Sequence, residues 1–205
     1  KKRELKGFLT VGTKYELKDA HDLSVAYTPG VAEPCLRIKD NEAESFELTC
    51  RSNMVAVVSD GTRVLGLGDI GAAAALPVME GKSLLFKKFG DVDCIPLVVD
   101  TKDADTLINT VKLLQKNFAG INLEDISSPK CYEIENRLKE ELEIPVFHDD
   151  QHGTAIIVAA GLLNALKVVK KNVEDVQVVI NGAGSAGIAI CKHLLNIGFK
   201  NVTMC

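Results

Sequence analysis

Four short apolar runs that end in acidic residues constrain the fold of this chain more than any other feature. They are MVAVVSD (54–60), CIPLVVD (94–100), AGINLED (119–125) and IPVFHDD (144–150). Their apolar residues are mostly continuous rather than alternating with polar ones, which is typical of strands that are buried on both faces. Because helix-like segments separate the runs, the sequence predicts a parallel sheet that is covered by helices on both sides.

Two of these helix-like segments lie between the first three runs. Residues 71–89 are rich in alanine and predict a helix, although Pro77 and Gly81 are expected to interrupt it. Residues 103–118 place four apolar side chains on one helical face, namely Leu107, Ile108, Val111 and Leu114.

Further helices are expected around the fourth apolar run and near the start of the chain. Ser128 and Pro129 predict the N-cap and the first position of a helix that continues through Leu142. Residues 153–169 predict a mostly apolar helix that begins at Gly153. For the first fifty residues we expect helices and turns around the YTPG motif.

Composition and charge exclude several classes of protein. The 205 residues carry a formal charge of −4 without a basic stripe, so no nucleic-acid partner is expected. The most apolar segment, 155–163, is too short to span a bilayer, and no signal peptide is visible behind the basic start. The 6 cysteines are scattered singly, which is typical of reduced cysteines in the cytoplasm.

The acids that follow the apolar runs predict a metal site. Ligands of open parallel sheets bind beyond the carboxyl ends of the strands, and acids gathered there repel one another unless a cation lies among them. Oxygen ligands of this kind favour Mg²⁺ or Mn²⁺. The pairs at 124–125 and 149–150 are the strongest candidates, whereas Asp60 and Asp100 are expected only to begin turns.

A zinc site on His148 and His152 is the alternative for the stretch FHDDQHGTA. The two histidines are four residues apart, which is the spacing of a zinc-binding helix. However, an apolar strand leads directly into them and the helix is expected only from Gly153. The aspartates are therefore the preferred ligands, and the histidines are expected to make supporting hydrogen bonds.

A glycine-rich loop predicts a dinucleotide site near the end of the chain. The loop GAGSAG consists of Gly182, Ala183, Gly184, Ser185, Ala186 and Gly187. It follows the strand-like run VQVVIN (176–181) and opens a helix-like segment, which is the context of the dinucleotide fingerprint. The segment GLGDIG (66–71) has the same spacing, but no comparable strand leads into it, and it favours a loop at the substrate site.

These features predict an α/β protein with two domains. A parallel-sheet substrate and metal domain is expected over residues 1–168, and an incomplete Rossmann-type dinucleotide-binding domain over 169–205. The charged stretch KVVKKNVED (167–175) is the expected joint. The residue that selects NAD or NADP is expected beyond Cys205, after the second strand of this unit.

Five stretches together resemble the malic enzyme family, in its short bacterial-type form. They are YTPGVAEPCL (27–36), SDGTRVLGLGDIGAAAALPVMEGK (59–82), INLEDIS (121–127), FHDDQHGTA (147–155) and VVINGAGSAGIAI (178–190). They occur in the family's order, and the resemblance extends over nearly the whole chain. The resemblance implies oxidative decarboxylation of malate to pyruvate with NAD or NADP and with Mg²⁺ or Mn²⁺.

The resemblance also implies a role for each matching residue. Tyr27 resembles the general acid that protonates the enolpyruvate carbon, and Lys82 resembles the general base for the 2-hydroxyl. Asp149 resembles the acid that orients the lysine, and Arg63 resembles the residue that binds a substrate carboxylate. Glu124, Asp125 and Asp150 resemble the three metal ligands, and residues 182–187 resemble the cofactor loop.

Other functions remain open at this stage. A malolactic-type enzyme would use the same site with retained NAD, and an amino-acid dehydrogenase would share the domain order without needing a metal. The chain could also be an inactive regulatory or dimerisation module. Malic enzymes carry a complete dinucleotide domain and further substrate-binding asparagines, so residues 1–205 alone are expected to bind cofactor poorly. A homodimer or larger assembly is expected.

Overall fold

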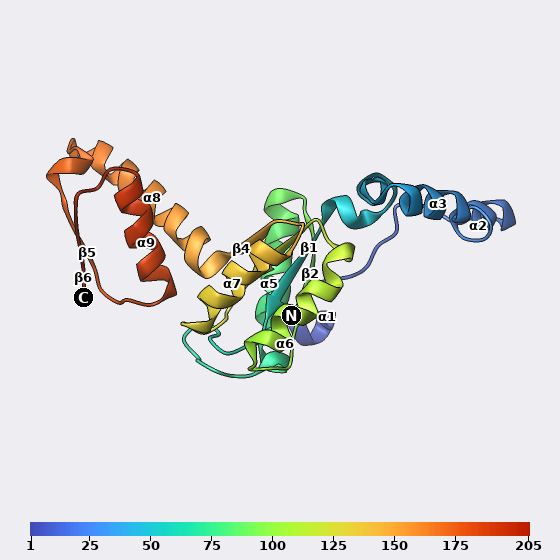
Figure 1. Ribbon diagram of the computed structural model, residues 1–205, viewed down its shortest axis with the longest axis horizontal. Coiled ribbons are helices and arrows are strands. Elements are labelled where there is room, and N and C mark those ends of the chain that lie inside the picture. Colours follow the sequence, from blue (N-terminus) through green and yellow to red (C-terminus); the bar gives the residue numbers. More distant parts are fainter.

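The computed structural model describes residues 1–205 as a central sheet flanked by an N-terminal arm and a C-terminal unit (Figure 1). The α-helices are α1 (Lys2–Leu5), α2 (Ala20–Ala26), α3 (Ala32–Asp40), α4 (Ser45–Leu48), α5 (Ala72–Gly90), α6 (Ala104–Leu114), α7 (Lys130–Glu141), α8 (Asp149–Val169) and α9 (Ser185–Asn196). The strands are β1 (Met54–Ser59), β2 (Asp93–Val98), β3 (Gly120–Leu123), β4 (Val146–His148), β5 (Gln177–Ile180) and β6 (Asn201–Met204). Short 3-10 helices are η1 (Glu42–Glu44), η2 (Cys50–Asn53), η3 (Gln115–Asn117) and η4 (Val173–Asp175).

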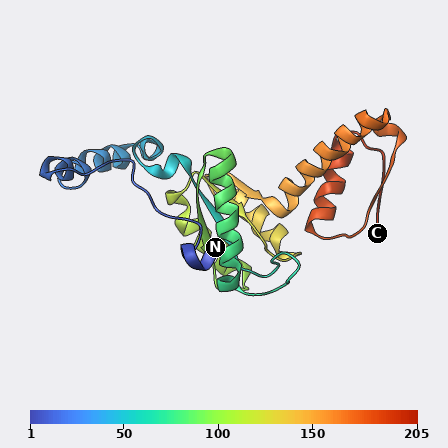
Figure 2. The same cartoon turned by 180° about the vertical axis from the view of Figure 1, so that it is seen from behind.

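The central sheet is parallel throughout, as predicted, and its strand order is β2-β1-β3-β4. Side chains of a strand alternate between the two faces of a sheet. On one face Ala56 and Val58 join a 14-residue core cluster with buried side chains of α6 and α7. Val57 is equally buried, and α5 packs along β1 and β2. Figure 2 shows α5 in front of the sheet from the reverse side. Helices therefore cover both faces.

Helix α5 is continuous, and the expected interruption at Pro77 and Gly81 is wrong. A proline inside a helix leaves the carbonyl four residues earlier, here that of Ala73, without its partner. Both Ala73 and Pro77 are exposed, so water can bond to the freed carbonyl. Gly81 needs no special conformation. Because α5 is continuous, it holds Lys82 at a fixed position relative to the sheet.

Helix α7 begins later than the sequence predicts. Pro129 occupies the N-cap position, Ser128 precedes it, and no side chain caps the helix. The Ser127 carbonyl instead accepts the Cys131 N–H at 3.1 Å. Backbone groups thus satisfy the first turn, and the expected serine cap and proline at the first helical position are corrected.

Helix α8 begins at Asp149 rather than at Gly153. The last residue of β4, His148, is its N-cap, so two acids occupy the first turn, where the helix dipole favours negative charge. At 21 residues α8 is long and apolar enough to cross a bilayer by length and composition alone. The expectation that the apolar segment 155–163 is too short to span a bilayer does not hold for the whole helix that contains it. A single helix of this kind is weak evidence for a membrane protein.

The first fifty residues form helices and turns, as expected. Helices α2 and α3 and the segments that join them to the rest of the chain form an arm. Helices α2 and α3 lie far from the sheet, on the side opposite α8 and α9 (Figures 1 and 2). None of the residues of α1, α2 or α3 is buried. Short isolated helices are marginal in water, and these three helices contribute no buried residue to the core.

The C-terminal unit consists of β5, α9 and β6 packed against the second half of α8. Its two strands pair in parallel, and α9 connects them, which is the predicted strand–helix–strand order. Its core is formed by Ala159, Leu166, Leu194 and Phe199. Helix α8 therefore runs without a break from the central sheet to this second core.

Candidate active site

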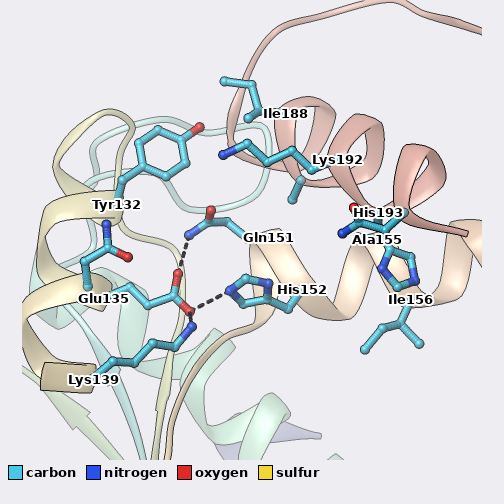
Figure 3. Close-up of a pocket in the computed structure, with 13 residues that line it drawn as sticks. Tyr132, Glu135, Lys139, Gln151, His152, Ala155, Ile156, Ile188, Lys192 and His193 are labelled. Atoms are coloured by element: carbon cyan, nitrogen blue, oxygen red, sulfur yellow. Dashed lines mark hydrogen bonds and ion pairs between the residues drawn. The ribbon is translucent and has the colours of Figure 1, made fainter. Parts of the chain in front are cut away.

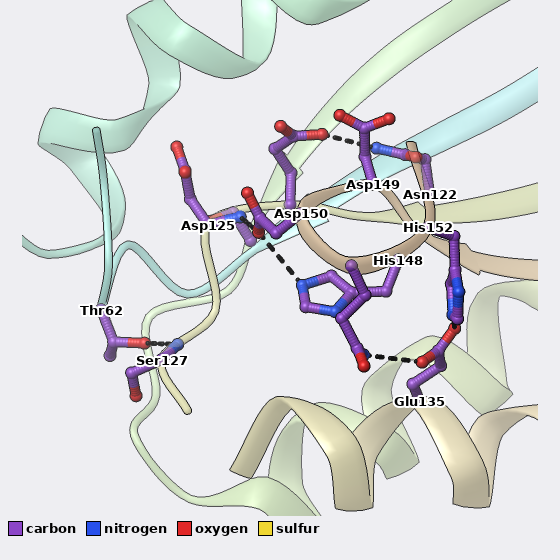
Figure 4. Close-up of polar contacts among 12 residues, drawn as sticks. Thr62, Asn122, Asp125, Ser127, Glu135, His148, Asp149, Asp150 and His152 are labelled. Carbon is purple, nitrogen blue, oxygen red and sulfur yellow. Dashed lines mark hydrogen bonds and ion pairs between the residues drawn. The ribbon is translucent and has the colours of Figure 1, made fainter. Parts of the chain in front are cut away.

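Two acidic pairs meet at one edge of the central sheet (Figure 4). Glu124 and Asp125 follow β3, while Asp149 and Asp150 follow β4, its neighbour in the sheet. Parallel strands end at the same edge, so adjacency of β3 and β4 brings the pairs together. One carboxylate oxygen from each of Glu124, Asp125 and Asp150 lies within 4.8 Å of the others. Asp149 is not part of this group.

The side chain of Lys82, in α5, contacts one acid of each pair. Its Nζ lies 2.7 Å from Asp149 Oδ2 and 3.1 Å from Glu124 Oε1. Burial lowers the pKa of Lys82, but the hydrogen bond to Asp149 and the charges of Glu124 and Asp149 outweigh it, so that the pKa is raised. In this arrangement Lys82 holds its proton, and the depressed pKa that a lysine base requires is not present without a cation.

The two acids after β3 are unusually hard to ionise. Burial raises the pKa of Glu124 to about 7, against the lowering effect of Lys82. Burial and the charge of Asp150 raise the pKa of Asp125 to about 6. In both carboxylates burial outweighs the lowering effect that the nearby Lys82 has on the pKa.

The donor set fits a divalent cation. Asp125 Oδ2 is buried and has no hydrogen-bond partner, which is costly for a carboxylate oxygen unless a cation contacts it. Three carboxylates match the oxygen ligands that Mg²⁺ and Mn²⁺ prefer. Asn122, which is buried in β3, donates to Glu124 Oε2 at 2.9 Å and fixes that side chain. Glu124, Asp125 and Asp150 would hold the ion.

These pKa shifts predict how pH affects stability. The folded-state pKa of Glu124 is about 7 against an ordinary value of 4.5, so the folded protein binds more protons over that range. In the metal-free protein this contribution is present below about pH 4.5 and is lost as the pH rises through 7. We expect the Tm of metal-free protein to fall less steeply from pH 5 to pH 8 in Glu124→Gln than in the wild type. Equal slopes would contradict this.

Arg63 lies beside the site, whereas Tyr27 does not. The backbone N–H of Arg63 donates to the Asp125 carbonyl at 3.1 Å, and its exposed guanidinium bonds to the Leu65 carbonyl at 3.0 Å. This places the GLGDIG loop next to the acids. Tyr27 is the C-cap of α2 in the arm, with 67% of its surface exposed. The structure thus brings Lys82, Arg63 and the four acids together and leaves Tyr27 apart.

Asp60 and Asp100 have no part in the cluster. Asp60 is buried after β1, and its Oδ1 accepts from the Thr62 N–H at 3.0 Å, as expected of an acid that begins a turn. Its Oδ2 lies 2.5 Å from the ammonium of Lys130. Asp100 is exposed in the loop after β2.

Both histidines make hydrogen bonds to carboxylates. His148 Nε2 lies 3.1 Å from Asp150 Oδ2, and His152 Nε2 lies 2.6 Å from Glu135 Oε1. Neither is in the cluster of potential ligands. Their contacts are those expected of supporting residues.

Sequence reasoning missed Asn122, Glu135 and Gln151. Glu135 is buried on the face of α7 that otherwise carries Cys131, Ile134 and Leu138. An acid among apolar positions at helical spacing was the available signal. Gln151 and His152 also line a cleft of about 620 Å³ between α7, α8 and α9 (Figure 3).

The glycine loop has the shape that a dinucleotide fingerprint requires. Gly182 has φ +114°, which a residue with a side chain rarely adopts, and a Cβ at Gly187 would lie 2.0 Å from the Gly182 carbonyl oxygen. Gly184 is the N-cap of α9, so backbone N–H groups of the first turn face the loop. The loop thus offers a close approach to a helix N-terminus, which suits a pyrophosphate.

Two alanine substitutions should separate packing from cofactor contact in this loop. In Gly187→Ala the new methyl group forces the backbone apart, and we expect unfolding to require about 1–3 kcal/mol less free energy. At Gly184 a Cβ meets nothing within 4 Å. Gly184→Ala should therefore stay within about 1 kcal/mol of the wild type while weakening dinucleotide binding. Urea unfolding measures the change in stability, and titration with the dinucleotide measures the change in binding. An unchanged free energy of unfolding in Gly187→Ala would contradict the packing argument.

Two family models match the chain. The one described as malic enzyme, N-terminal domain, matches residues 9–105 and 101–139, and the one described as malic enzyme, NAD binding domain, matches 151–202. The chain belongs to the malic enzyme family. The resemblance seen in the sequence is thereby confirmed. Glu124 and Asp125 lie within the N-terminal match, and Asp149 and Asp150 directly precede the NAD-binding match.

Individual relatives agree with the family. An NAD-dependent malic enzyme of Geobacillus stearothermophilus is 57% identical over 196 residues, which are 96% of this chain and 41% of the relative. A bifunctional malic/malolactic enzyme of Bacillus subtilis is 56% identical over 199 residues, 97% of this chain and 48% of the relative. The crystal structure of an NAD-dependent malic enzyme from Thermotoga maritima has a TM-score of 0.95 at 50% identity, covering 99% of this chain and 54% of that one. This chain thus spans about half the length of these three proteins.

Proposed function

We propose that the protein oxidises (S)-malate with NAD⁺ or NADP⁺ and decarboxylates the resulting oxaloacetate to pyruvate and CO₂. The observation that carries this proposal is the position of Lys82 between Asp149 and Glu124, beside a cluster of three carboxylates. A proton acceptor next to a cation site is what removal of a proton from a 2-hydroxy acid requires. Family membership supplies the substrate and the cofactor class, since relatives are named as NAD-dependent or NADP-dependent malic enzymes.

Each residue has a defined task in this proposal. Lys82 Nζ takes the proton of the malate 2-hydroxyl, while Asp149 holds the amine in place. Arg63 binds a carboxylate of malate with its exposed guanidinium. Tyr27 later gives its phenolic proton to the carbon of enolpyruvate. Mg²⁺ or Mn²⁺ held by Glu124, Asp125 and Asp150 would supply Lewis-acid chemistry at the substrate oxygens, and NAD⁺ or NADP⁺ at residues 182–187 would supply the hydride acceptor.

The charge balance around Lys82 explains why the lysine could lose its proton only in the loaded site. Two carboxylates keep its pKa high, while burial acts in the opposite direction. A cation beside Glu124 would offset the charge of that carboxylate, so that of the two acids that raise the pKa of Lys82 only Asp149 would still act at full strength. The lowering effect of burial on the pKa of Lys82 would then be opposed less strongly, and the amine would become a better base.

Product analysis on the full-length protein tests the function. With malate, Mg²⁺ or Mn²⁺ and free NAD⁺ or NADP⁺ we expect reduced cofactor and pyruvate in equal amounts, and EDTA should abolish both. A malolactic activity is the second candidate, because one relative is named a bifunctional malic/malolactic enzyme. Lactate without net reduction of added cofactor would favour it. Turnover that survives EDTA, or no turnover of malate at all, would contradict the proposal.

We also propose the domain organisation and the location. The proposed boundary lies between residues 168 and 169, one residue before the end of α8 (Asp149–Val169). A cytoplasmic location is in keeping with 6 free cysteines.

We also propose a homodimer or larger assembly, and the exposed arm supports this proposal. The arm joins the sheet at Met54, where β1 starts, whereas the acids follow the ends of β3 and β4 at the opposite edge. Tyr27 therefore does not reach Lys82 within this arrangement of one chain. We propose that a second copy covers the unburied helices of the arm, and that Tyr27 acts on the site of that copy.

Subunit complementation should test this arrangement directly. Tyr27→Phe and Lys82→Met should each be inactive alone. In a mixed dimer one site would combine an intact Lys82 with an intact Tyr27 from the other subunit. After co-refolding or co-expression in equal amounts we expect about a quarter of the wild-type activity. Absence of any recovery, with mixed dimers verified by differently tagged subunits, would place both residues in one protomer's site.

A further inference from the structure

We propose that Glu135 and Gln151 are positioning residues that hold His148 in its Nε2–H tautomer, so that His148 donates a hydrogen bond to Asp150. This inference rests on the proposed metal site, because Asp150 is one of its ligands. A continuous series of contacts leads from α7 to the cluster through four side chains, namely Glu135, Gln151, His148 and Asp150. Figure 4 labels Glu135, His148 and Asp150 of this series. The direction of every hydrogen bond in the series follows from the chemistry of the groups.

The series begins at Glu135, whose carboxylate can only accept hydrogen bonds. Glu135 is 3% exposed, and three donors surround it. Lys139 Nζ lies 2.7 Å and His152 Nε2 lies 2.6 Å from its Oε1. The lysine ammonium and the imidazole share Oε1 of this carboxylate, and Oε2 of Glu135 is left to Gln151.

Gln151 is oriented by this carboxylate. Its side-chain nitrogen lies 2.8 Å from Glu135 Oε2, and the reversed amide would bring two acceptor oxygens together. The same nitrogen lies 2.8 Å from Nδ1 of His148. An amide NH₂ carries two hydrogens, so one points to Glu135 and the other to the imidazole.

His148 therefore has only one tautomer that satisfies its neighbours. Because an N–H faces Nδ1, that nitrogen must accept, and the ring proton must be on Nε2. Nε2 lies 3.1 Å from Asp150 Oδ2 and donates to it. His148 is 0% exposed, so no water can replace either partner. A buried acid on α7 thus sets the position of a proton next to the metal cluster.

The hydrogen bond that His148 donates fixes the orientation of the Asp150 carboxylate. Its Oδ2 accepts from His148 and also from the Asp125 N–H at 2.9 Å. Two donors occupy this oxygen and fix the carboxylate plane, and in this orientation Asp150 would be held ready for the ion. Outer residues of this kind commonly change metal affinity by about 10- to 100-fold. With the other tautomer, two lone pairs would face each other across the His148–Asp150 contact.

The tautomer can be measured directly in the full-length protein. In ¹⁵N-histidine-labelled protein with Mg²⁺ at pH 7.5, we expect the His148 signal to show a protonated Nε2 and an unprotonated Nδ1. Comparison with His148→Asn assigns the signal. A protonated Nδ1 would overturn the proposal without recourse to any further variant.

Gln151→Met tests the cause, since methionine has a similar size and no N–H. We expect a mixture of tautomers and about 10-fold or greater weakening of Mn²⁺ binding in the absence of substrate. Lys139→Met is the matched control, because it also removes a contact of Glu135 but leaves the Gln151–His148 bond in place. It should keep the wild-type tautomer.

The outcomes separate this proposal from the proposed function. If Gln151→Met, folded by circular dichroism, keeps both the wild-type tautomer and the wild-type Mn²⁺ affinity, the positioning role is wrong. If the tautomer shifts in Lys139→Met as well, the effect is not carried by Gln151 alone and the proposal also fails. Neither readout uses malate, so failure of malate oxidation would leave the result unchanged.

Discussion

Replacing Lys82 with methionine should lower malate oxidation by about a thousandfold while leaving the fold intact. The substitution removes the only amine that contacts both Asp149 and Glu124. Without it the 2-hydroxyl has no positioned acceptor for its proton. Steady-state rates at saturating malate and metal, together with circular dichroism, measure the loss.

Lys82→Arg distinguishes a base from a fixed positive charge. Arginine keeps the charge and can still pair with the two carboxylates, but it does not lose its proton in proteins. If Lys82 serves as a base, arginine should be nearly as inactive as methionine. Recovery of more than about a tenth of the activity in Lys82→Arg would show that only the charge is needed.

Lys87→Met is the matched control for these two variants. Lys87 belongs to the same helix, but it is exposed and pairs with Asp91 and Asp93 at the far end of α5. Its removal should leave the rate within about twofold of the wild type, since surface ion pairs contribute little. A comparable loss in Lys87→Met would mean that α5 itself had been disturbed.

The central sheet and its acidic edge could be predicted because both depend on local patterns. Continuous apolar runs predict buried parallel strands, and all parallel strands end at one edge. It followed that Glu124, Asp125 and Asp150 could meet. What the patterns could not give was the strand order, which makes β3 and β4 neighbours and leaves Asp100, at the end of β2, on the other side of β1.

Helix boundaries were less predictable because they depend on tertiary surroundings. Pro77 is tolerated in α5 because Ala73 and Pro77 lie on an exposed side of the helix, and exposure is not visible in a sequence. Helix α8 begins at Asp149, where a glycine-based expectation had placed a loop. There the acidic first turn and the N-cap at His148 determine the start.

The supporting network and the position of Tyr27 are properties of the three-dimensional arrangement. Glu135 and Gln151 belong to different helices and meet only because α7 packs beside the start of α8. The YTPG motif indicated a functional tyrosine, but no local pattern tells that α2 extends away from the sheet. The geometry, rather than the motif, raises the question of which subunit Tyr27 serves.

Asp150→Asn should weaken Mn²⁺ binding by more than about a hundredfold, beyond the effect expected of outer residues. Asparagine has nearly the same shape and can still accept from the Asp125 N–H, so the loss would report the missing charge rather than a disturbed fold. Because the charge of Asp150 raises the pKa of Asp125, the metal-free variant should be no less stable than the wild type.

Asp149→Asn is the adjacent control that assigns the two aspartates. Asp149 contacts Lys82 at 2.7 Å and lies outside the group of three potential ligands, so its loss should lower the rate while Mn²⁺ affinity changes by less than about tenfold. His148→Asn and His152→Asn should each reduce activity less than Asp150→Ala, because they act through Asp150 or Glu135 rather than on the ion. Equal loss of Mn²⁺ binding in Asp149→Asn and Asp150→Asn would contradict the division between a metal ligand and a partner of the lysine.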